Sequence, residues 1–204
     1  MADTLSSAAV PAVRDAAVLL AQVQAAWERS GAGDLWVFGY ASLIWRPEFP
    51  SVEQRAATVH GWHRALKMRS RINRGTLEHP GLVFALLRGG ACRGMAYRLA
   101  ADQVREELPR LWLREMPTGV YDARWVSCRT GQGPLQALAF TLPADSPNHT
   151  GALSDEAMLQ IFATARGRYG TTLDYLLETA AGLRRHGIKD AEVERLVALA
   201  QRLG

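Results

Sequence analysis

Glu115 is a candidate for proton transfer. It follows the largely apolar residues 111–114, which have helical spacing, and precedes residues 116–119, which break that pattern. A carboxyl group among apolar neighbours has its charged form disfavoured, which raises its pKa toward values useful for acid–base catalysis. The alternative is a structural glutamate at a helix end, paired with Arg114 or another cation, and local sequence alone favours this alternative.

Residues 35–45, with the sequence LWVFGYASLIW, are a candidate ligand-binding segment. An apolar run here breaks into Gly39-Tyr40-Ala41-Ser42 before it turns apolar again, which is typical of a buried strand that opens into a polar loop. Backbone N–H groups in such a loop can face a ligand instead of a neighbouring strand. The loop is therefore a candidate receptor.

Ser42 does not fit a serine hydrolase. Its surroundings, YASLI, lack the glycines of the G-x-S-x-G turn, and no histidine is marked by sequence as its base. A phosphate-binding loop is not supported either, because Gly31-x-Gly33 precedes a predicted strand instead of opening a helix. Nucleotide binding therefore has no positive support.

His60 and His63 are the best candidates for a metal site, yet their spacing argues against one. They lie three residues apart in an extended run and should point to opposite faces of a sheet. The two cysteines, Cys92 and Cys128, form no Cys-x-x-Cys motif and no Cys/His cluster. The sequence therefore indicates no metal and no disulfide scaffold.

A basic run lies between residues 64 and 74. Its members are Arg64, Lys67, Arg69, Arg71 and Arg74, and positions 67, 69 and 71 share one face of a strand. Nucleic-acid binding usually adds several aromatic side chains for stacking, and only Trp62 is near. The remaining interpretations are a solvated strand face, or binding of a carboxylate-rich small molecule through one or two of these residues.

The elements that position these residues form an α+β pattern. A helix is predicted over residues 13–27, strands at 35–38, 57–69, 82–87, 92–99, 124–129 and 135–142, and further helices at 102–115, after Ser154, at 173–185 and at 190–203. Gly89-Gly90 and Gly131-Gln132-Gly133-Pro134 are typical of tight hairpins. The prediction is a mixed sheet or small barrel with surrounding helices and a helical C-terminal region.

Length and charge favour one soluble domain with a small-molecule ligand. The chain has 204 residues and a net charge of +4, a mild excess that suits anionic small molecules without requiring nucleic acid. It contains no apolar stretch of the roughly 20 residues that a membrane helix needs, and its first ten residues do not resemble a signal peptide. We therefore expect a cytoplasmic protein, with no membrane partner, that is a monomer.

Five short motifs in register resemble one family. They are Phe38-Gly39-Tyr40-Ala41-Ser42-Leu43-Ile44-Trp45, Arg74-Gly75-Thr76 with Pro80-Gly81, Cys92-Arg93-Gly94-Met95-Ala96-Tyr97, Leu113-Arg114-Glu115-Met116 with Tyr121, and Tyr175-Leu176 with His186-Gly187-Ile188-Lys189-Asp190. Their order and spacing are similar to those of the ChaC-type γ-glutamylcyclotransferases over about four-fifths of the chain.

The resemblance implies a lyase, a glutathione-specific γ-glutamylcyclotransferase, that cleaves glutathione into 5-oxoproline and cysteinylglycine without a metal or organic cofactor. It also implies a compact mixed fold with a small β-barrel. We expect residues 1–33 to form an N-terminal extension with one helix and residues 34–204 to form a single γ-glutamylcyclotransferase-like domain. The catalytic acid/base would be Glu115, and the substrate would be bound by Gly39, Tyr40, Ala41, Ser42, Leu43, Ile44, Arg74, Tyr121 and Tyr175.

Ala41 departs from the family, whose members carry glycine at this position. If the position needs a positive φ, alanine costs about 1 kcal/mol. If φ is negative, the methyl group only narrows the pocket.

Two other functions stay open on the sequence. A related cyclotransferase would act on other γ-glutamyl amines or amino acids, and a non-catalytic regulator would bind γ-glutamyl compounds without turnover. The basic residues 64–74 offer a partner for the glycine carboxylate of glutathione, which favours glutathione. Only Ala41 suggests the regulator.

Overall fold

The computed structural model describes residues 15–116 and 119–203 and has the predicted α+β composition. Its helices are α1 (Ala16–Arg29), α2 (Ser42–Trp45), α3 (Ala101–Glu115), α4 (Asp155–Thr164), α5 (Thr172–Arg185), α6 (Ala191–Ala200) and the short 3-10 helix η1 (Gln201–Leu203). Its strands are β1 (Leu35–Gly39), β2 (Glu53–Ser70), β3 (Gly81–Leu99), β4 (Asp122–Thr130), β5 (Gly133–Thr141), β6 (Arg166–Gly167) and β7 (Gly170–Thr171).

Within the described residues, five strands close into a barrel in the order β1-β3-β2-β4-β5. Neighbouring strands are antiparallel except β1 and β5, which pair in parallel at Val37 and Leu138. Val37, Val59 and Leu138 are at most 1% exposed, because alternate residues of each strand point into the barrel. The predicted small barrel is confirmed.

The long strands β2 and β3 correct one predicted hairpin. β3 runs without a break through Gly89 and Gly90, whose φ angles are 100° and 69°, and the ladder to β2 changes register between His60 and Trp62. The two strands predicted on either side of these glycines are therefore one strand with a bulge. Positive φ serves both a hairpin and a bulge, and the extended partner strand decides for the bulge.

The second predicted hairpin is confirmed. β4 and β5 pair in antiparallel register up to Thr130 and Gly133, and Gly133 has a φ of 106°. The Thr130 side chain also donates a hydrogen bond of 2.7 Å to the Gly133 carbonyl. This hairpin starts at Asp122, so it brings the residues just before β4 to the rim of the barrel.

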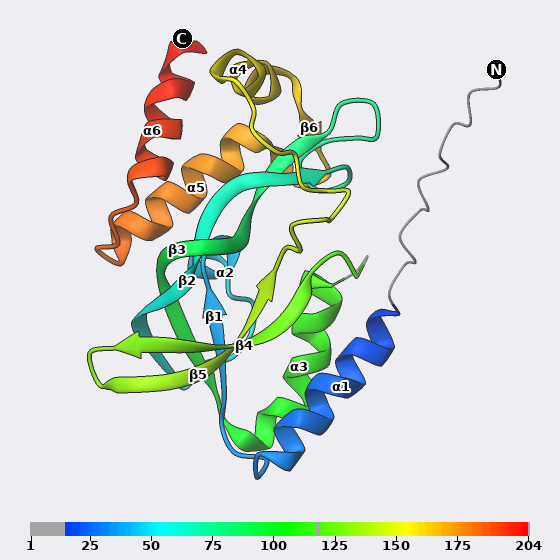
Figure 1. Cartoon of the computed structure of the whole chain (residues 1–204), viewed down its shortest axis with the longest axis vertical. Helices are drawn as coiled ribbons and strands as arrows, with labels where there is room; N and C mark the ends of the chain where they lie inside the picture. The colour runs from blue at the N-terminus through cyan, green and yellow to red at the C-terminus, as the bar shows by residue number, and fades with distance from the viewer. Residues whose placement is uncertain (1–14, 117–118, 204) are drawn as a thin grey trace, which may run out of the picture.

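Helices α1 and α3 lie side by side at one end of the barrel (Figure 1). Trp112 of α3 donates from Nε1 to the Ala16 carbonyl of α1 at 2.8 Å, and its ring contacts that of Phe140 of β5 at 5.8 Å between centroids. Val23 and Trp27 of α1 belong to the same buried core as the barrel. The predicted helix at 102–115 forms despite Pro109 and ends at Glu115, against the barrel.

The C-terminal helices α4, α5 and α6 gather at the other end of the molecule (Figure 1). Side-chain caps start each of them: Ser154 for α4, Thr171 in a capping box with Asp174 for α5, and Asp190 for α6. Trp45 of the short helix α2 donates from Nε1 to Thr179 of α5 at 3.2 Å. This contact places α5 next to the end of β1.

Gly75 and Gly81 let two backbone segments touch. A Cβ atom on Gly75 would lie 2.0 Å from the Gly81 nitrogen, and one on Gly81 would lie 2.0 Å from the Arg74 oxygen. Real Cβ atoms are not found at such distances from backbone. The motif of Arg74-Gly75-Thr76 with Pro80-Gly81 therefore has a structural reason, because it closes the connection between β2 and β3 against the start of α5.

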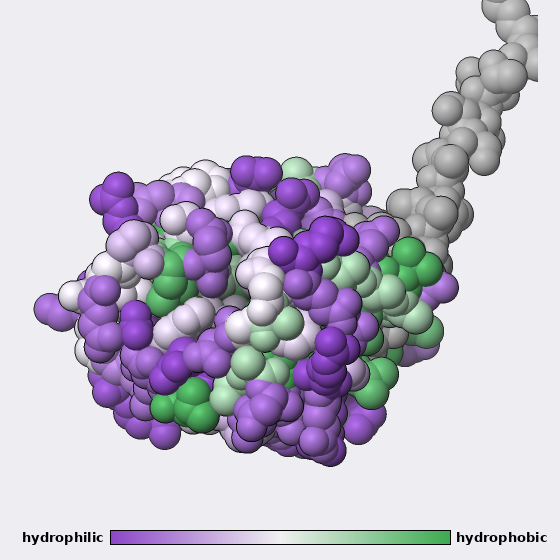
Figure 2. Space-filling view, turned by 90° about the horizontal axis from the view of Figure 1, so that it is seen from below, coloured by the Kyte–Doolittle hydropathy of each residue, from purple (hydrophilic) through white to green (hydrophobic). Residues whose placement is uncertain are grey.

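The face of the molecule seen in Figure 2 is mostly hydrophilic, with hydrophobic residues in small separate groups. No helix among residues 15–116 and 119–203 has the length and apolar character to cross a membrane.

Candidate active site

The loop predicted to bind a ligand follows β1 directly and becomes helix α2. Ala41 has φ −144° and ψ −112°, so the family glycine is not replaced at a position of positive φ. The cost of a positive φ therefore does not apply, and the alanine is buried, with 5% of it exposed. Leu43 and Ile44 are each 4% exposed, and the Ile44 N–H donates to the Ala41 carbonyl at 2.8 Å.

Buried side chains hold this loop from beneath. Tyr97 donates from its hydroxyl to the Ile44 carbonyl at 3.4 Å, and a Cβ on Gly39 would lie 3.0 Å from the Tyr97 ring. Arg64 donates from Nε to the Tyr40 carbonyl at 2.8 Å. Sequence patterns predicted no role for Tyr97 and offered Arg64 only as part of a basic run that could bind a carboxylate, since these hydrogen bonds join segments that are far apart along the chain.

Glu115 ends α3 as a nearly buried carboxylate, with 16% of its side chain exposed. Its Oε1 lies 3.1 Å from Arg114 Nε, and Arg114 also pairs with Glu48 at 3.0 Å. Burial raises the pKa of Glu115, the Arg114 guanidinium opposes the rise, and the Glu48 carboxylate adds to it. Glu115 therefore has a feature of each sequence interpretation: it is paired with Arg114, and its pKa is raised.

Three tyrosines from distant segments share an electrostatic environment with Glu115. Burial raises the pKa of Tyr40, Tyr121 and Tyr175 above the ordinary value of 10.0, and the charge of Glu115 adds to the rise at each of them. A side-chain hydrogen bond with Tyr40 opposes the rise at Tyr121. These hydroxyls stay protonated at neutral pH and can act as hydrogen-bonding groups.

Tyr40 and Tyr175 also make hydrogen bonds that stabilise the fold. Tyr40 donates from its hydroxyl to the Phe140 carbonyl at 3.0 Å, which ties the loop to the end of β5. Tyr175 accepts from the Phe84 N–H at 3.3 Å, and its ring contacts that of Trp45. These contacts join the loop after β1 to β5, and α5 to β3 and α2.

Replacement of Tyr175 by phenylalanine is expected to lower the free energy of unfolding by about 1–3 kcal/mol, because the buried Phe84 N–H then loses its acceptor. Chemical denaturation checks this. Tyr169→Phe is the matched control, since Tyr169 is 47% exposed. Equal stability of the Tyr175 variant and the wild type would contradict the hydrogen bond.

A second prediction concerns pH. Because the pKa of Glu115 is raised in the folded state above its ordinary value of 4.5, the folded protein holds this proton more tightly than the unfolded chain does. The contribution of Glu115 to stability is therefore present at low pH and lost as pH rises through the folded pKa. Glu115→Gln has no such proton, so its stability relative to wild type should increase between about pH 4 and about pH 8. Thermal melts across this range test it, and parallel curves would contradict it.

The basic run is not a solvated strand face. Arg64 is 4% exposed and Arg74 is 7% exposed. Arg69 donates to the His149 carbonyl at 3.3 Å and Arg71 donates to the Asn148 side chain. The charge pattern looked solvated because these partners come from a segment about eighty residues later.

Arg74 borders the site through Tyr175. Its guanidinium lies over the Tyr175 ring at 5.2 Å from the centroid. Its Nη1 donates to the Tyr169 carbonyl at 2.6 Å, and its Nη2 lies 3.5 Å from Glu178 Oε2. These contacts fix the β6–β7 turn against α5.

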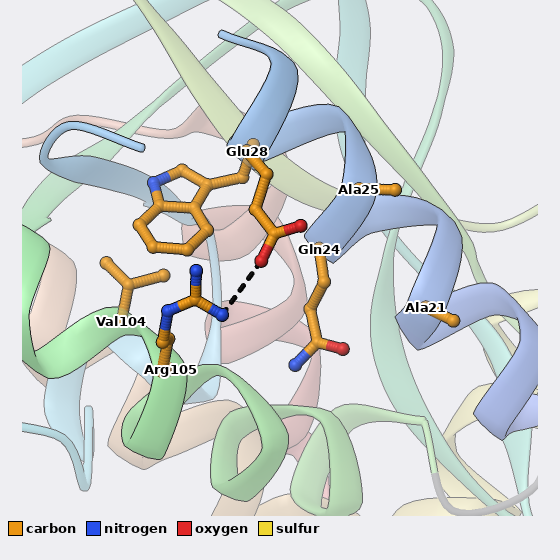
Figure 3. Close-up of a pocket in the computed structure, with 7 residues that line it drawn as sticks. Ala21, Gln24, Ala25, Glu28, Val104 and Arg105 are labelled. Atoms are coloured by element: carbon orange, nitrogen blue, oxygen red, sulfur yellow. Dashed lines mark ion pairs between the residues drawn. The ribbon is translucent and has the colours of Figure 1, made fainter. Parts of the chain in front are cut away.

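A surface depression of about 270 Å³ lies elsewhere, between α1 and α3 (Figure 3). It is lined by Ala21, Gln24, Ala25, Trp27, Glu28, Val104 and Arg105, and Glu28 pairs with Arg105 at 2.8 Å. Arg105 is ten residues before Glu115 on α3, roughly 15 Å along the helix. The two charged side chains of the depression pair with each other, and none of the predicted site residues lines it.

Among residues 15–116 and 119–203, no group of three or more potential metal-ligating side chains comes together. Cys92 and Cys128 are both free and buried, and burial raises the pKa of both thiols.

The comparisons with known proteins agree with the geometry. The family described as ChaC-like protein matches residues 35–203. The glutathione-specific gamma-glutamylcyclotransferase of Escherichia coli is 34% identical over 176 residues, which cover 86% of this chain and 76% of that protein. The glutathione-specific gamma-glutamylcyclotransferase 1 of Homo sapiens is 34% identical over 175 residues, with 83% and 78% covered.

A solved structure supports the fold. The crystal structure of the gamma-glutamylcyclotransferase specific to glutathione from yeast has a TM-score of 0.73 and 18% identity, and the match covers 83% of this chain and 99% of that one. The predicted γ-glutamylcyclotransferase-like fold is confirmed. Since the family match extends over most of the sequence and includes the strand, loop and helix that carry the candidate site, this chain belongs to the ChaC-like protein family.

Proposed function

We propose that this protein cleaves glutathione into 5-oxoproline and cysteinylglycine. The observation that carries the proposal is Glu115, a nearly buried carboxyl group of raised pKa within the electrostatic range of Tyr40, Tyr121 and Tyr175. The relatives named above are glutathione-specific γ-glutamylcyclotransferases, which adds support.

The reaction is an intramolecular transfer. The α-amine of the γ-glutamyl group attacks its own γ-carbonyl carbon, a five-membered lactam forms, and the amide bond to the cysteine nitrogen breaks. The α-ammonium has a reference pKa near 8 and is not a nucleophile until it loses a proton. Glu115 takes this proton and later gives it to the leaving amine. The attacking nitrogen loses a second proton after the attack, and this proton also passes to the leaving amine, which departs as an ammonium group, so no water is consumed and no protein nucleophile is needed.

The loop after β1 supplies orientation. Because nucleophile and electrophile belong to one molecule, the enzyme has to hold the folded-back conformer, and orientation of this kind is worth roughly 7–11 kcal/mol. Backbone N–H groups of Tyr40, Ala41, Ser42 and Leu43 hold the α-carboxylate or stabilise the oxyanion of the tetrahedral intermediate. Gly39 and Ile44 complete this cradle, and Tyr121 and Tyr175 donate hydrogen bonds to the substrate.

Arg74 is the remaining residue of the proposed substrate site. It positions Tyr175, over whose ring it lies, and offers a cation near the glycine carboxylate of glutathione.

The test is direct. Purified protein is incubated with glutathione, and 5-oxoproline and cysteinylglycine are measured. Equal amounts of both products support the proposal. Saturable binding of glutathione without turnover would contradict it and favour a non-catalytic regulator.

The second candidate is a cyclotransferase for other γ-glutamyl amines. It is favoured by relatives named only gamma-glutamylcyclotransferase, such as gamma-glutamylcyclotransferase 2-3 of Arabidopsis thaliana at 28% identity. γ-Glutamyl dipeptides that lack the terminal glycine discriminate between the two. A higher kcat/KM for these dipeptides than for glutathione would favour the second candidate.

The same proposal covers the organisation of the protein. Residues 34–204 form one catalytic domain, preceded by the segment 1–33, and the enzyme works as a monomer in the cytoplasm. The two buried free thiols fit a reducing compartment. Light scattering coupled to size exclusion tests the monomer, and fractionation of cells tests the compartment.

A further inference from the structure

Arg64 is a buried cation in the middle of β2. None of its side chain is exposed, and burial of a charge costs several kcal/mol unless close partners compensate it. Its partners are specific: Nε donates to the Tyr40 carbonyl at 2.8 Å, Nη2 donates to the Arg93 carbonyl, and Nη1 lies 3.3 Å from Asp190 Oδ2. The guanidinium therefore joins the candidate substrate loop, β3 and the start of α6.

The contact with Tyr40 sets the direction of a backbone donor. In a trans peptide the C=O and the following N–H point to opposite sides, and none of the described peptide bonds is cis. Arg64 holds the Tyr40 carbonyl on the buried side, so the Ala41 N–H of the same peptide unit points away from Arg64. Within the described residues the Ala41 N–H donates no hydrogen bond, which leaves this donor for a ligand.

Asp190 holds the other end of this contact. Its Oδ1 accepts from the Val193 N–H at 3.1 Å as the N-cap of α6, and its Oδ2 pairs with Arg64. One carboxylate thus fixes both the helix and the arginine. The proposed catalytic steps use no residue of the motif at 186–190. The contacts of Asp190 give this motif a role.

We propose that Arg64 is a positioning residue, which fixes the Tyr40–Ala41 peptide so that its N–H binds the α-carboxylate of the γ-glutamyl group, and that Asp190 holds Arg64 in place. The inference rests on the proposed function, because it assigns the loop to γ-glutamyl binding. A purely structural arginine would behave differently, because its loss would change stability without changing substrate affinity.

The test compares Arg64→Lys, Arg64→Met and Asp190→Asn. Lysine keeps the charge but lacks the fork of donors that reaches Tyr40 and Arg93 together, and asparagine keeps the N-cap but removes the charge. Arg55→Met is the matched control, since Arg55 lies on the same strand and its partner is Glu53. Steady-state kinetics with glutathione are measured at a temperature where melting curves show every variant folded.

We expect kcat/KM for glutathione to fall at least about 10-fold in Arg64→Lys, with most of the change in KM, because the α-carboxylate is bound in the ground state. Asp190→Asn should raise KM several-fold, and Arg55→Met should match the wild type. Wild-type KM in a folded Arg64→Lys protein would overturn the inference.

A binding measurement keeps the result independent of turnover. In a Glu115→Gln background, calorimetry with glutathione gives Kd with and without Arg64→Lys. The expected Kd is at least about 10-fold higher in the double variant than in Glu115→Gln alone. Equal values in the two proteins would again overturn the inference. Failure of the wild type to form 5-oxoproline would instead contradict the proposed function, which distinguishes the two failures.

Discussion

Glu115→Gln is expected to lower kcat for 5-oxoproline formation from glutathione by about 10²- to 10⁴-fold, the usual contribution of a general acid–base group. Glutamine has nearly the same shape but cannot take a proton from the α-ammonium. The change removes the Arg114–Glu115 ion pair, but the Arg114 guanidinium keeps Glu48 as a partner. The protein should therefore stay folded while it loses activity.

Glu48→Gln is the control for this experiment. The Glu48 side chain is 44% exposed and is the other carboxylate that pairs with Arg114. Its replacement removes one cause of the raised pKa of Glu115. Its kcat should change only a few-fold, and the acidic limb of its pH–rate profile should shift to lower pH. A Glu115→Gln variant with robust activity would remove the carboxylate from the mechanism.

Gly81→Ala is expected to lower the free energy of unfolding by about 3 kcal/mol or more, the largest loss among the variants proposed. The added Cβ would lie 2.0 Å from the Arg74 oxygen and 2.6 Å from Thr172 Oγ1. Neither group can move freely, because Thr172 is fully buried and its Oγ1 accepts from the Leu82 N–H at 2.9 Å. The backbone has to separate, and the start of α5 moves with it.

Gly131→Ala is the matched control. No atom lies within 4 Å of a Cβ at Gly131, so its stability should stay within about 0.5 kcal/mol of wild type. Urea denaturation of both variants gives the comparison. Because α5 carries Tyr175, the Gly81 variant should also lose activity in proportion to the displacement of this helix. Similar stability of the two variants would show that the two segments do not touch as described.

Much of the fold follows from short-range pattern. Extended runs bounded by glycine or proline at residues 35–38, 124–129 and 135–142 predicted strands, and the helical spacing of residues 102–115 predicted α3. Such local patterns are visible in the sequence itself. The hairpin predicted at Gly89-Gly90 was wrong, because this prediction also used local sequence alone. Positive φ is a local property, whereas the choice between a turn and a bulge depends on the partner strand.

The candidate site likewise has features that local sequence predicts and features that depend on tertiary contacts. Sequence alone identified the residue types that matter, Glu115 after an apolar stretch and a polar loop after a buried strand, because these types follow from local chemistry and from motifs of short span. Only the tertiary structure decided that Glu115 is at once paired and buried, that Ala41 has a negative φ, and that Arg64 holds the loop. Burial, pKa and hydrogen-bond partners are set by groups far away in the chain, and a linear pattern carries no record of which distant groups the fold brings into contact.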